Sequence, residues 1–533
     1  MKTTLKFSIL FLIWSSAVFA QQYKERLSTI NIEHYKLAID LNDDNDSIAA
    51  KMAIELRFRK SIPSFYLDLA SFDSISGKGM KVDSIFQNKV AVDFKHKNNR
   101  LTIYPKHNFA NLTYTYTIKY RGVPEDGLII GKNVHGDRTF FGDNWPNRAQ
   151  NWFPCIDHPS DKATIEYIVK APKHYKIIAN GELIEEVDLN ENTKQTHWKT
   201  SKPLPTKVMV IGASNFAVDS LGVIDSIIPV TSWVYKQNKE KGFHDLVNSK
   251  EILEFYIDLF GKYPFEKLAS VQSTTRYGGM ENASCIFYPE SSFTGEQKFE
   301  NTIAHEIVHQ WFGNSASEID WPHVWLSEGF ATYFTDIYVQ KTKGDSIFQK
   351  RMQQERARVL KFHETTKTAV VDTKTTNYMQ LLNPNSYQKG AWVLHMLRKK
   401  LGDDAFYKGI KAYYEKYKYR NASTNGFKRI MAASSGKNLD VFFKQWLENP
   451  GHPVLKTQWL YFNNRIRIMI EQVQGGIFEF PLDIELIYED GSSEIKTIEV
   501  DYLNAPYSIE TSGDVKEIKF DPNTWLLFEL TTE

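Results

Sequence analysis

The apolar pattern of this chain changes period twice, and that change constrains the fold more than any other feature. Thr113–Tyr120 alternates strictly between apolar and polar residues, as expected of a strand with one buried face. Shorter runs of the same kind occur at Tyr35–Leu41, Ala53–Phe58 and Ile165–Val169. No long helical period precedes about residue 240, so this part of the chain predicts a mostly antiparallel β domain.

Beyond that point the apolar residues follow a helical spacing, in segments 246–260, 301–312, 326–340, 388–401 and 404–417. After Gly451-His452-Pro453 the alternation returns, for example over Leu482–Leu486. We therefore expect a multidomain α and β protein. It would comprise an N-terminal β domain over residues 21–234, a mainly helical domain over 235–452 and a small C-terminal β-sandwich over 453–533.

Residues 1–20 are expected to be a targeting segment. Lys2 and Lys6 precede the apolar run Phe7–Trp14, and small residues follow up to Ala20. This order is typical of a secretory signal peptide, and the run is shorter than the roughly 20 residues of a spanning helix, which disfavours a retained anchor. We expect an exported mature chain, periplasmic or secreted, with no membrane span.

Composition excludes some classes of function. The 65 basic and 64 acidic residues nearly cancel, so the charge gives no electrostatic footprint for nucleic acid. With 42% hydrophobic and 24% charged residues, the chain has the balance of a folded protein. Only two cysteines are present, Cys155 and Cys285. They could form one disulfide or remain two buried thiols, but they are too few to be the framework of the fold.

His305-Glu306-Ile307-Val308-His309 is the strongest chemical signal. On a helix, two imidazoles four residues apart project from the same face, as zinc binding requires. The alternative is a pair of surface histidines on an amphipathic helix. A catalytic zinc needs a third protein ligand, and Glu328 lies at the start of a second helical run. On composition alone, the competing ligands are Asp320, His323 and Asp336.

Taken together, His305, Glu306, His309 and Glu328 resemble the zinc signature of the aminopeptidase N and leukotriene hydrolase family of metallopeptidases. The segment Gly278-Gly279-Met280-Glu281-Asn282 resembles the exopeptidase motif of that family, in its double-glycine form. Tyr387-Gln388-Lys389-Gly390-Ala391 resembles its catalytic-tyrosine segment, and residues 153–159 resemble a stretch of its N-terminal β domain. The similarity extends over most of residues 30–450.

This resemblance implies a thermolysin-like catalytic domain with one zinc ion per chain, held by His305, His309 and Glu328. Glu306 points about 100° around the helix from His305, which suits a general base. Tyr387 would donate to the oxyanion. Residues 278–282 would bind the substrate, with Glu281 on the α-ammonium group of peptides that have a free N-terminal amine.

The chain departs from the family pattern in three places. No room remains after the β-sandwich for the large helical C-terminal domain of many relatives, so we expect a more open cavity. Trp145 stands where relatives place a glutamine that helps to hold the substrate amine, and Asn144 is only a guess for its replacement. Leu382 stands where leukotriene hydrolases have a second functional tyrosine, which counts against epoxide chemistry.

The sequence predicts a zinc-dependent aminopeptidase and leaves alternatives open. One is a bifunctional epoxide hydrolase or a zinc endopeptidase. A more remote one is a peptide-binding module without catalysis, against which the intact set of signature residues argues. The oligomeric state, the preferred N-terminal residue and the physiological substrate are not predicted.

Overall fold

The computed structural model describes Tyr23 and residues 25–531, so the predicted signal peptide lies outside the described residues. Two compact units can be distinguished. The first contains the described residues up to Trp321 together with Tyr417–Ala422, and the second contains Pro322–Lys416 and the described residues from Ser423 onward. The domain boundaries at residues 234 and 452 stay predictions.

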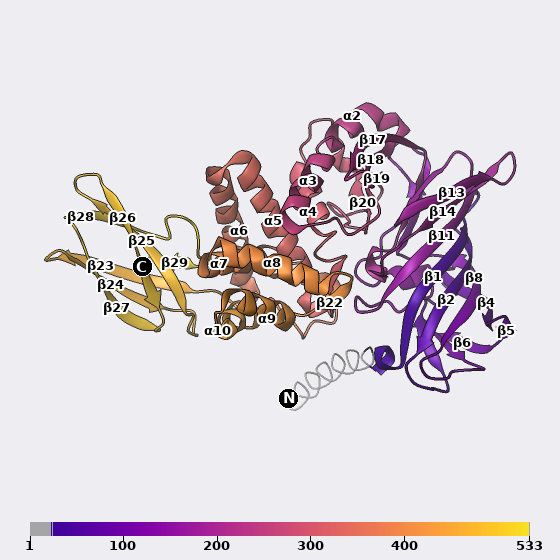
Figure 1. Cartoon of the computed structure of the whole chain (residues 1–533), viewed down its shortest axis with the longest axis horizontal. Coiled ribbons are helices and arrows are strands. Elements are labelled where there is room, and N and C mark those ends of the chain that lie inside the picture. The colour runs from indigo at the N-terminus through magenta and orange to yellow at the C-terminus, as the bar shows by residue number, and fades with distance from the viewer. Residues whose placement is uncertain (1–22, 24, 532–533) are drawn as a thin grey trace. The chain divides into compact units, whose positions relative to one another are not determined.

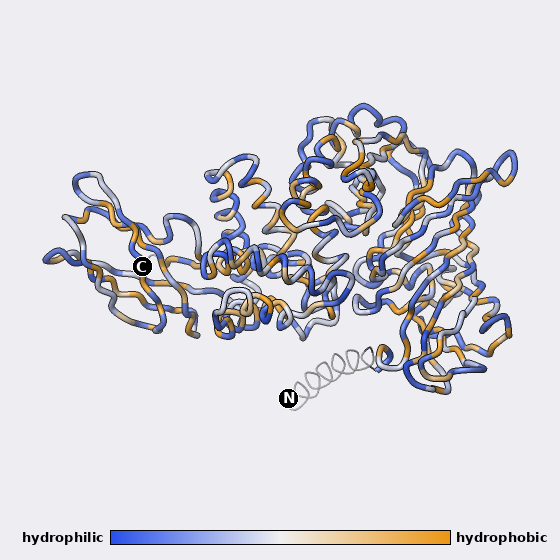
Figure 2. The backbone as a smooth tube through the Cα atoms, in the orientation of Figure 1, coloured by the Kyte–Doolittle hydropathy of each residue, from blue (hydrophilic) through white to orange (hydrophobic). Residues whose placement is uncertain are grey.

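A nine-stranded sheet dominates the first unit, with the strand order β13-β14-β11-β1-β2-β8-β4-β5 and with β15 beside β11. Only β1 and β11 pair in parallel among these strands, which confirms the mostly antiparallel prediction. Figure 2 shows hydrophobic and hydrophilic residues alternating along them. The strands are β1 (Ile30–Asp40), β2 (Ile48–Phe58), β4 (Gly79–Gln87), β5 (Val90–Ala91), β8 (Thr113–Val123), β11 (Lys162–Pro172), β13 (Glu182–Asp188), β14 (Thr193–Lys199) and β15 (Leu204–Pro205).

Smaller sheets complete the first unit, in the orders β3-β7-β6, β12-β16-β10-β9, β17-β18-β19-β20 and β21-β22. Their strands are β3 (Phe65–Asp68), β6 (Asp93–Lys97), β7 (Arg100–Tyr104), β9 (Leu128–Lys132), β10 (Arg138–Gly142), β12 (Lys176–Ala179), β16 (Ile211–Ser214), β17 (Phe216–Ile224), β18 (Ile228–Tyr235), β19 (Leu268–Ser273), β20 (Cys285–Pro289), β21 (Ala316–Glu318) and β22 (Arg420–Ala422).

Three helices pack beside the β17–β20 sheet (Figure 1): α2 (Lys239–Leu246), α3 (Ser249–Phe260) and α4 (Glu300–Val308). The segment predicted as one helix over 246–260 is α3, which a short break at Val247 and Asn248 separates from α2. The helix predicted over 301–312 is shorter and ends at Val308, because the backbone amides of Asn314 and Ser315 bond to carbonyl oxygens five residues back and do not continue the helical pattern.

The second unit begins with helices, of which α5, α7 and α8 match predicted segments. They are α5 (Trp325–Lys343), α6 (Asp345–Thr365), α7 (Gly390–Leu401), α8 (Asp403–Tyr417), α9 (Thr424–Ser435) and α10 (Asp440–Phe443). A π-helical turn, Asn385–Lys389, directly precedes α7. The sequence did not predict α6, since only five of its 21 residues are buried and its apolar period is therefore weak.

Two sheets follow, in the orders β27-β24-β23-β29 and β26-β25-β28, as predicted for the C-terminal part. Asn463 and Asn464 join β23 to β24 with positive φ angles of 50° and 53°, the turn that this pair favours in a tight hairpin. The strands are β23 (Val454–Phe462), β24 (Arg465–Gln472), β25 (Phe480–Tyr488), β26 (Ser493–Val500), β27 (Asn504–Glu510), β28 (Val515–Phe520) and β29 (Glu529–Thr531).

Two further expectations concern the cysteines and the membrane. Cys155 and Cys285 are both buried free thiols, so of the two alternatives the structure has the thiols. Within residues 25–531, no helix combines the length and the apolar character needed to cross a membrane.

Candidate active site

His305 and His309 lie at the C-terminal end of α4, where their Nε2 atoms are 3.2 Å apart. His309 follows the last residue of the helix but keeps helical dihedral angles, so both rings project from one face. Two Zn–N bonds of 2.0–2.1 Å in a tetrahedral site place their nitrogens about 3.3 Å apart. The spacing of the two rings therefore fits a shared zinc ion.

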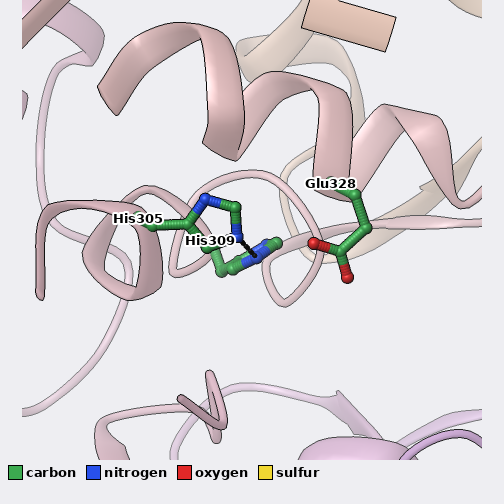
Figure 3. Close-up of side chains that lie close together, drawn as sticks. All are labelled: His305, His309 and Glu328. Atoms are coloured by element: carbon green, nitrogen blue, oxygen red, sulfur yellow. Dashed lines mark hydrogen bonds between the residues drawn. The ribbon is translucent and has the colours of Figure 1, made fainter. Parts of the chain in front are cut away.

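Glu328, in the first turn of α5, completes the set, because the ligand atoms of His305, His309 and Glu328 all lie within 4.8 Å of one another. Figure 3 shows its carboxylate facing the ring of His309. Two histidines and one glutamate are a donor set of catalytic zinc sites, which keep the fourth position open. This is the one such cluster found in the part of the chain that the structure describes.

The tautomer of His309 also suits metal binding. Its Nδ1 lies 3.2 Å from the backbone carbonyl oxygen of Phe312. A carbonyl oxygen can only accept, so Nδ1 carries the proton and Nε2 keeps its lone pair for the metal.

The competing ligands have other partners. His323 Nδ1 lies 2.9 Å from Thr424 Oγ1, and the buried Asp336 accepts from Arg351 at 2.7 Å. Asp320 lies 3.4 Å from His158. Each is bonded to a neighbour outside the cluster, whereas the carboxylate of Glu328 belongs to it.

The predicted general base and the double-glycine segment come together at α4. Glu306 is 5% exposed, and a Cβ added to Gly279 would overlap its carboxyl group. Gly279 therefore allows the loop to approach Glu306 more closely than a residue with a side chain could without displacing that carboxyl. Gly278 is exposed, and a Cβ there would meet nothing within 4 Å.

The rest of the segment is fixed to the same helix end and to β20. The backbone oxygen of Glu281 accepts from Gln310 Nε2 at 2.9 Å and from Asn314 Nδ2 at 2.5 Å. Met280 exchanges two backbone hydrogen bonds with Phe287, of 2.8 and 3.0 Å. Residues just after the second histidine thus hold the loop that carries Glu281.

The carboxylate of Glu281 is buried, and its hydrogen bonds are incomplete. Its side chain is almost completely buried, at 5% exposure, and its Oε1 atom has no hydrogen-bond partner among the described residues. A buried carboxylate oxygen without a partner is costly, and a cationic hydrogen-bond donor would satisfy it. The buried amide of Asn282 likewise has no partner in the described part of the chain.

Asp143 adds negative charge near this loop. Burial raises the pKa of Asp143 to about 6, against the lowering effect of Arg148, and the charge of Glu281 contributes to the rise.

Asn144 does not replace the glutamine of the relatives as an open amine ligand. Its Oδ1 accepts from Trp152 Nε1 at 2.8 Å, and its Nδ2 donates to the carbonyl oxygens of Thr206 and Met209.

Tyr387 is half-buried in the middle of the π-helical turn Asn385–Lys389. A Cβ on Gly329 would lie 2.9 Å from the Gly390 backbone, so α5 and the start of α7 are in close backbone contact. This contact is one residue from Glu328 and three from Tyr387. It therefore fixes the backbone of the third ligand relative to that of the tyrosine within the second unit.

Comparison with known proteins identifies the family. Residues 31–208 match the peptidase M1 N-terminal domain, and residues 244–446 match the peptidase family M1 domain. The chain belongs to peptidase family M1. The M1 domain match includes α4, α5 and the π-helical turn, and therefore all the candidate catalytic and metal-binding residues.

Two curated relatives show the extent of the similarity. The chain is 26% identical over 520 residues to probable aminopeptidase 2 of Sulfurisphaera tokodaii, covering 92% of this chain and 62% of the relative. It is 29% identical over 332 residues to human glutamyl aminopeptidase, covering 59% of this chain and 34% of the relative. It thus spans less than two thirds of the length of either relative.

Among solved structures, an M1 zinc metallopeptidase variant from Deinococcus radiodurans with a bound Tyr-Ser-Ala substrate has a similar fold. The TM-score is 0.69 at 22% identity, over 80% of this chain and 95% of the other. This likeness concerns the fold.

Sequence reasoning missed the surroundings of Tyr387, in which His363, Asn385, Lys389 and His452 are all buried. A buried lysine next to a catalytic motif leaves no periodic signal. His452 lies in the Gly451-His452-Pro453 break, which the sequence analysis interpreted only as a boundary.

Proposed function

We propose that this protein is a zinc-dependent aminopeptidase that removes the N-terminal residue of peptides. Membership of family M1 and the His305, His309 and Glu328 cluster support zinc binding. The observation that carries the exopeptidase assignment is Glu281, whose buried and unpartnered carboxylate oxygen belongs to a loop bonded to the end of the metal-binding helix.

The protein residues would divide the chemistry among them. Bound zinc supplies the Lewis-acid chemistry that activates water and polarises a carbonyl oxygen. Glu306, buried beside the two histidines, takes a proton from the attacking water and delivers it to the leaving amine. Tyr387 donates its phenolic O–H to the oxyanion that develops on the substrate carbonyl.

Glu281 would decide which peptides are cleaved. An α-ammonium group has a positive charge and three N–H donors, so it can form a charge-assisted hydrogen bond with Glu281 Oε1. An internal peptide bond of a longer chain brings neither to that position. Residues 278–282 thereby restrict a general metallopeptidase site to free N-termini.

The compartment is part of the proposal. The signal peptide predicted over residues 1–20 would export the chain, so peptides of the periplasm or the surrounding medium would be its substrates.

Metal analysis tests the core of this proposal. Purified wild-type protein should contain zinc, and His309→Ala should lose both the zinc and the hydrolysis of aminoacyl-coumarin substrates. His323→Ala is the matched control, because this histidine is close in sequence but is bonded to Thr424 and lies outside the cluster. Equal zinc content in the wild type and in His309→Ala would contradict the ligand assignment.

A further inference from the structure

The π-helical turn that carries Tyr387 is held at both ends by buried polar side chains. Asn385 is its first residue and Lys389 its last, and both are at most 1% exposed. Lys389 Nζ donates to the backbone oxygen of Gly451 at 2.7 Å. Asn385 Oδ1 lies 2.8 Å from Nε2 of His363, which belongs to α6.

A second histidine extends this chain of contacts. His363 Nδ1 lies 2.7 Å from His452 Nδ1, and the two ring planes differ by only 12°, an arrangement that fits a hydrogen bond in the plane of both rings. His452 Nε2 is 3.2 Å from Glu529 in β29, at the edge of the C-terminal sheet. Both ends of the turn are therefore connected to the adjacent residues Gly451 and His452.

Hydrogen-bond donors and acceptors fix the direction of this chain. Asn385 Nδ2 donates to the carbonyl oxygen of Thr368 at 3.0 Å, so Oδ1 must face His363 and accept from its Nε2–H. Burial and the charge of Lys389 lower the pKa of His363 to about 4, so its ring is neutral at neutral pH. His363 Nδ1 is then an acceptor, and His452 Nδ1–H must donate to it.

A π-helical turn is a rare conformation that is frequent at functional sites, and it departs from the helix that it precedes. Each end of this turn is held by a buried, hydrogen-bonded side chain, Asn385 at the start and Lys389 at the end. Tyr387 lies two residues from each end and is half-buried, between the two buried anchors.

We propose that His363 and His452 are positioning residues for Tyr387, which hold Asn385 and with it the turn that presents the phenol. The connection to the C-terminal β-sandwich thereby becomes a structural component of the catalytic apparatus. This inference rests on the proposed role of Tyr387 as the oxyanion donor.

A double-mutant cycle on the zinc-loaded full chain tests it. His452→Phe keeps a planar aromatic ring but removes the donor, whereas His452→Asn keeps a donor close to the position of Nδ1. We expect His452→Phe to lower kcat about 10- to 100-fold with KM little changed and zinc retained, as for other residues that orient a reacting group. His452→Asn should recover most of this loss.

The decisive measurement is the effect of His452→Phe in a protein that already carries Tyr387→Phe. Tyr387→Phe should itself lower kcat on the order of 10²-fold, and His452→Phe should then add less than about twofold, because the group that it positions is already absent. His395→Phe is the control, since this histidine is equally buried in the second unit but bonds to Thr524 instead. Its effect on kcat should be the same in both backgrounds.

The outcomes separate the two hypotheses. If Tyr387→Phe lowers kcat but His452→Phe leaves kcat unchanged, or costs the same factor in both backgrounds, the histidines are merely structural and the inference is wrong. If Tyr387→Phe leaves kcat unchanged, the oxyanion role falls, and the inference falls with it.

Discussion

Glu281→Gln offers a test in which activity and stability should change in opposite directions. The substitution keeps the shape of the side chain and removes its charge. In the substrate-free protein the carboxylate is 5% exposed, and one of its oxygens has no partner among the described residues. Desolvating a charge costs more than desolvating a neutral amide, so the variant should unfold at an equal or higher temperature than the wild type.

The expected loss of activity follows from the charge pair. Removing one member of a buried, hydrogen-bonded charge pair typically costs about 2–5 kcal/mol. At about 1.4 kcal/mol per factor of ten, kcat/KM on free-amine substrates should fall by roughly 30-fold to several thousand-fold. The zinc content should not change, because Glu281 is outside the ligand cluster.

The assay compares kcat/KM for alanyl- and leucyl-coumarins, together with thermal unfolding, in the wild type, Glu281→Gln and Glu290→Gln. Glu290 is a suitable control because its carboxylate accepts from the backbone of Val134 and is outside the motif. A fall in both activity and unfolding temperature would show that Glu281 has a structural role. Unchanged kcat/KM would refute its role in amine binding.

Two further predictions concern the general base and a buried histidine. Glu306→Gln should keep zinc and fold while kcat falls by about 10²- to 10⁴-fold, and a full zinc site with unchanged kcat would exclude Glu306 as the base. Burial lowers the pKa of His395 to about 3, from an unfolded value near 6.5. As the pH falls, the unfolded chain binds this proton before the folded protein does. The wild type should therefore lose about 1.4 kcal/mol of stability per pH unit, relative to His395→Gln, between about pH 6 and pH 4. Parallel pH profiles of urea unfolding for the two proteins would contradict this.

Much of the architecture was predictable because strand and helix patterns are local. The alternation in Thr113–Tyr120 predicts one buried face of β8. The four side chains on that face are buried, as expected: Tyr114, Tyr116, Ile118 and Tyr120. Helix α6 was not predictable in this way, since most of its length faces solvent or polar partners. The end of α4 was predicted four residues too late, because the turn after His309 depends on contacts with Asn314 and Ser315.

The metal cluster was predictable because two ligands share one helical face and the third lies in a recognisable motif. Choosing among Glu328, Asp320, His323 and Asp336 from composition was not possible, since the choice depends on which carboxylate or imidazole the fold brings close to His305 and His309. The chain from His452 to Asn385 joins residues 67 positions apart, and no sequence period reports such a contact.

Product analysis by mass spectrometry tests the central claim most directly. Zinc-loaded wild-type protein would be incubated with a peptide of about ten residues and with its N-acetylated form. The proposed aminopeptidase should shorten the free peptide one residue at a time from its N-terminus and leave the acetylated form intact. Internal cleavage of both peptides would instead indicate an endopeptidase, and an absence of cleavage by the zinc-loaded protein would indicate a peptide-binding module.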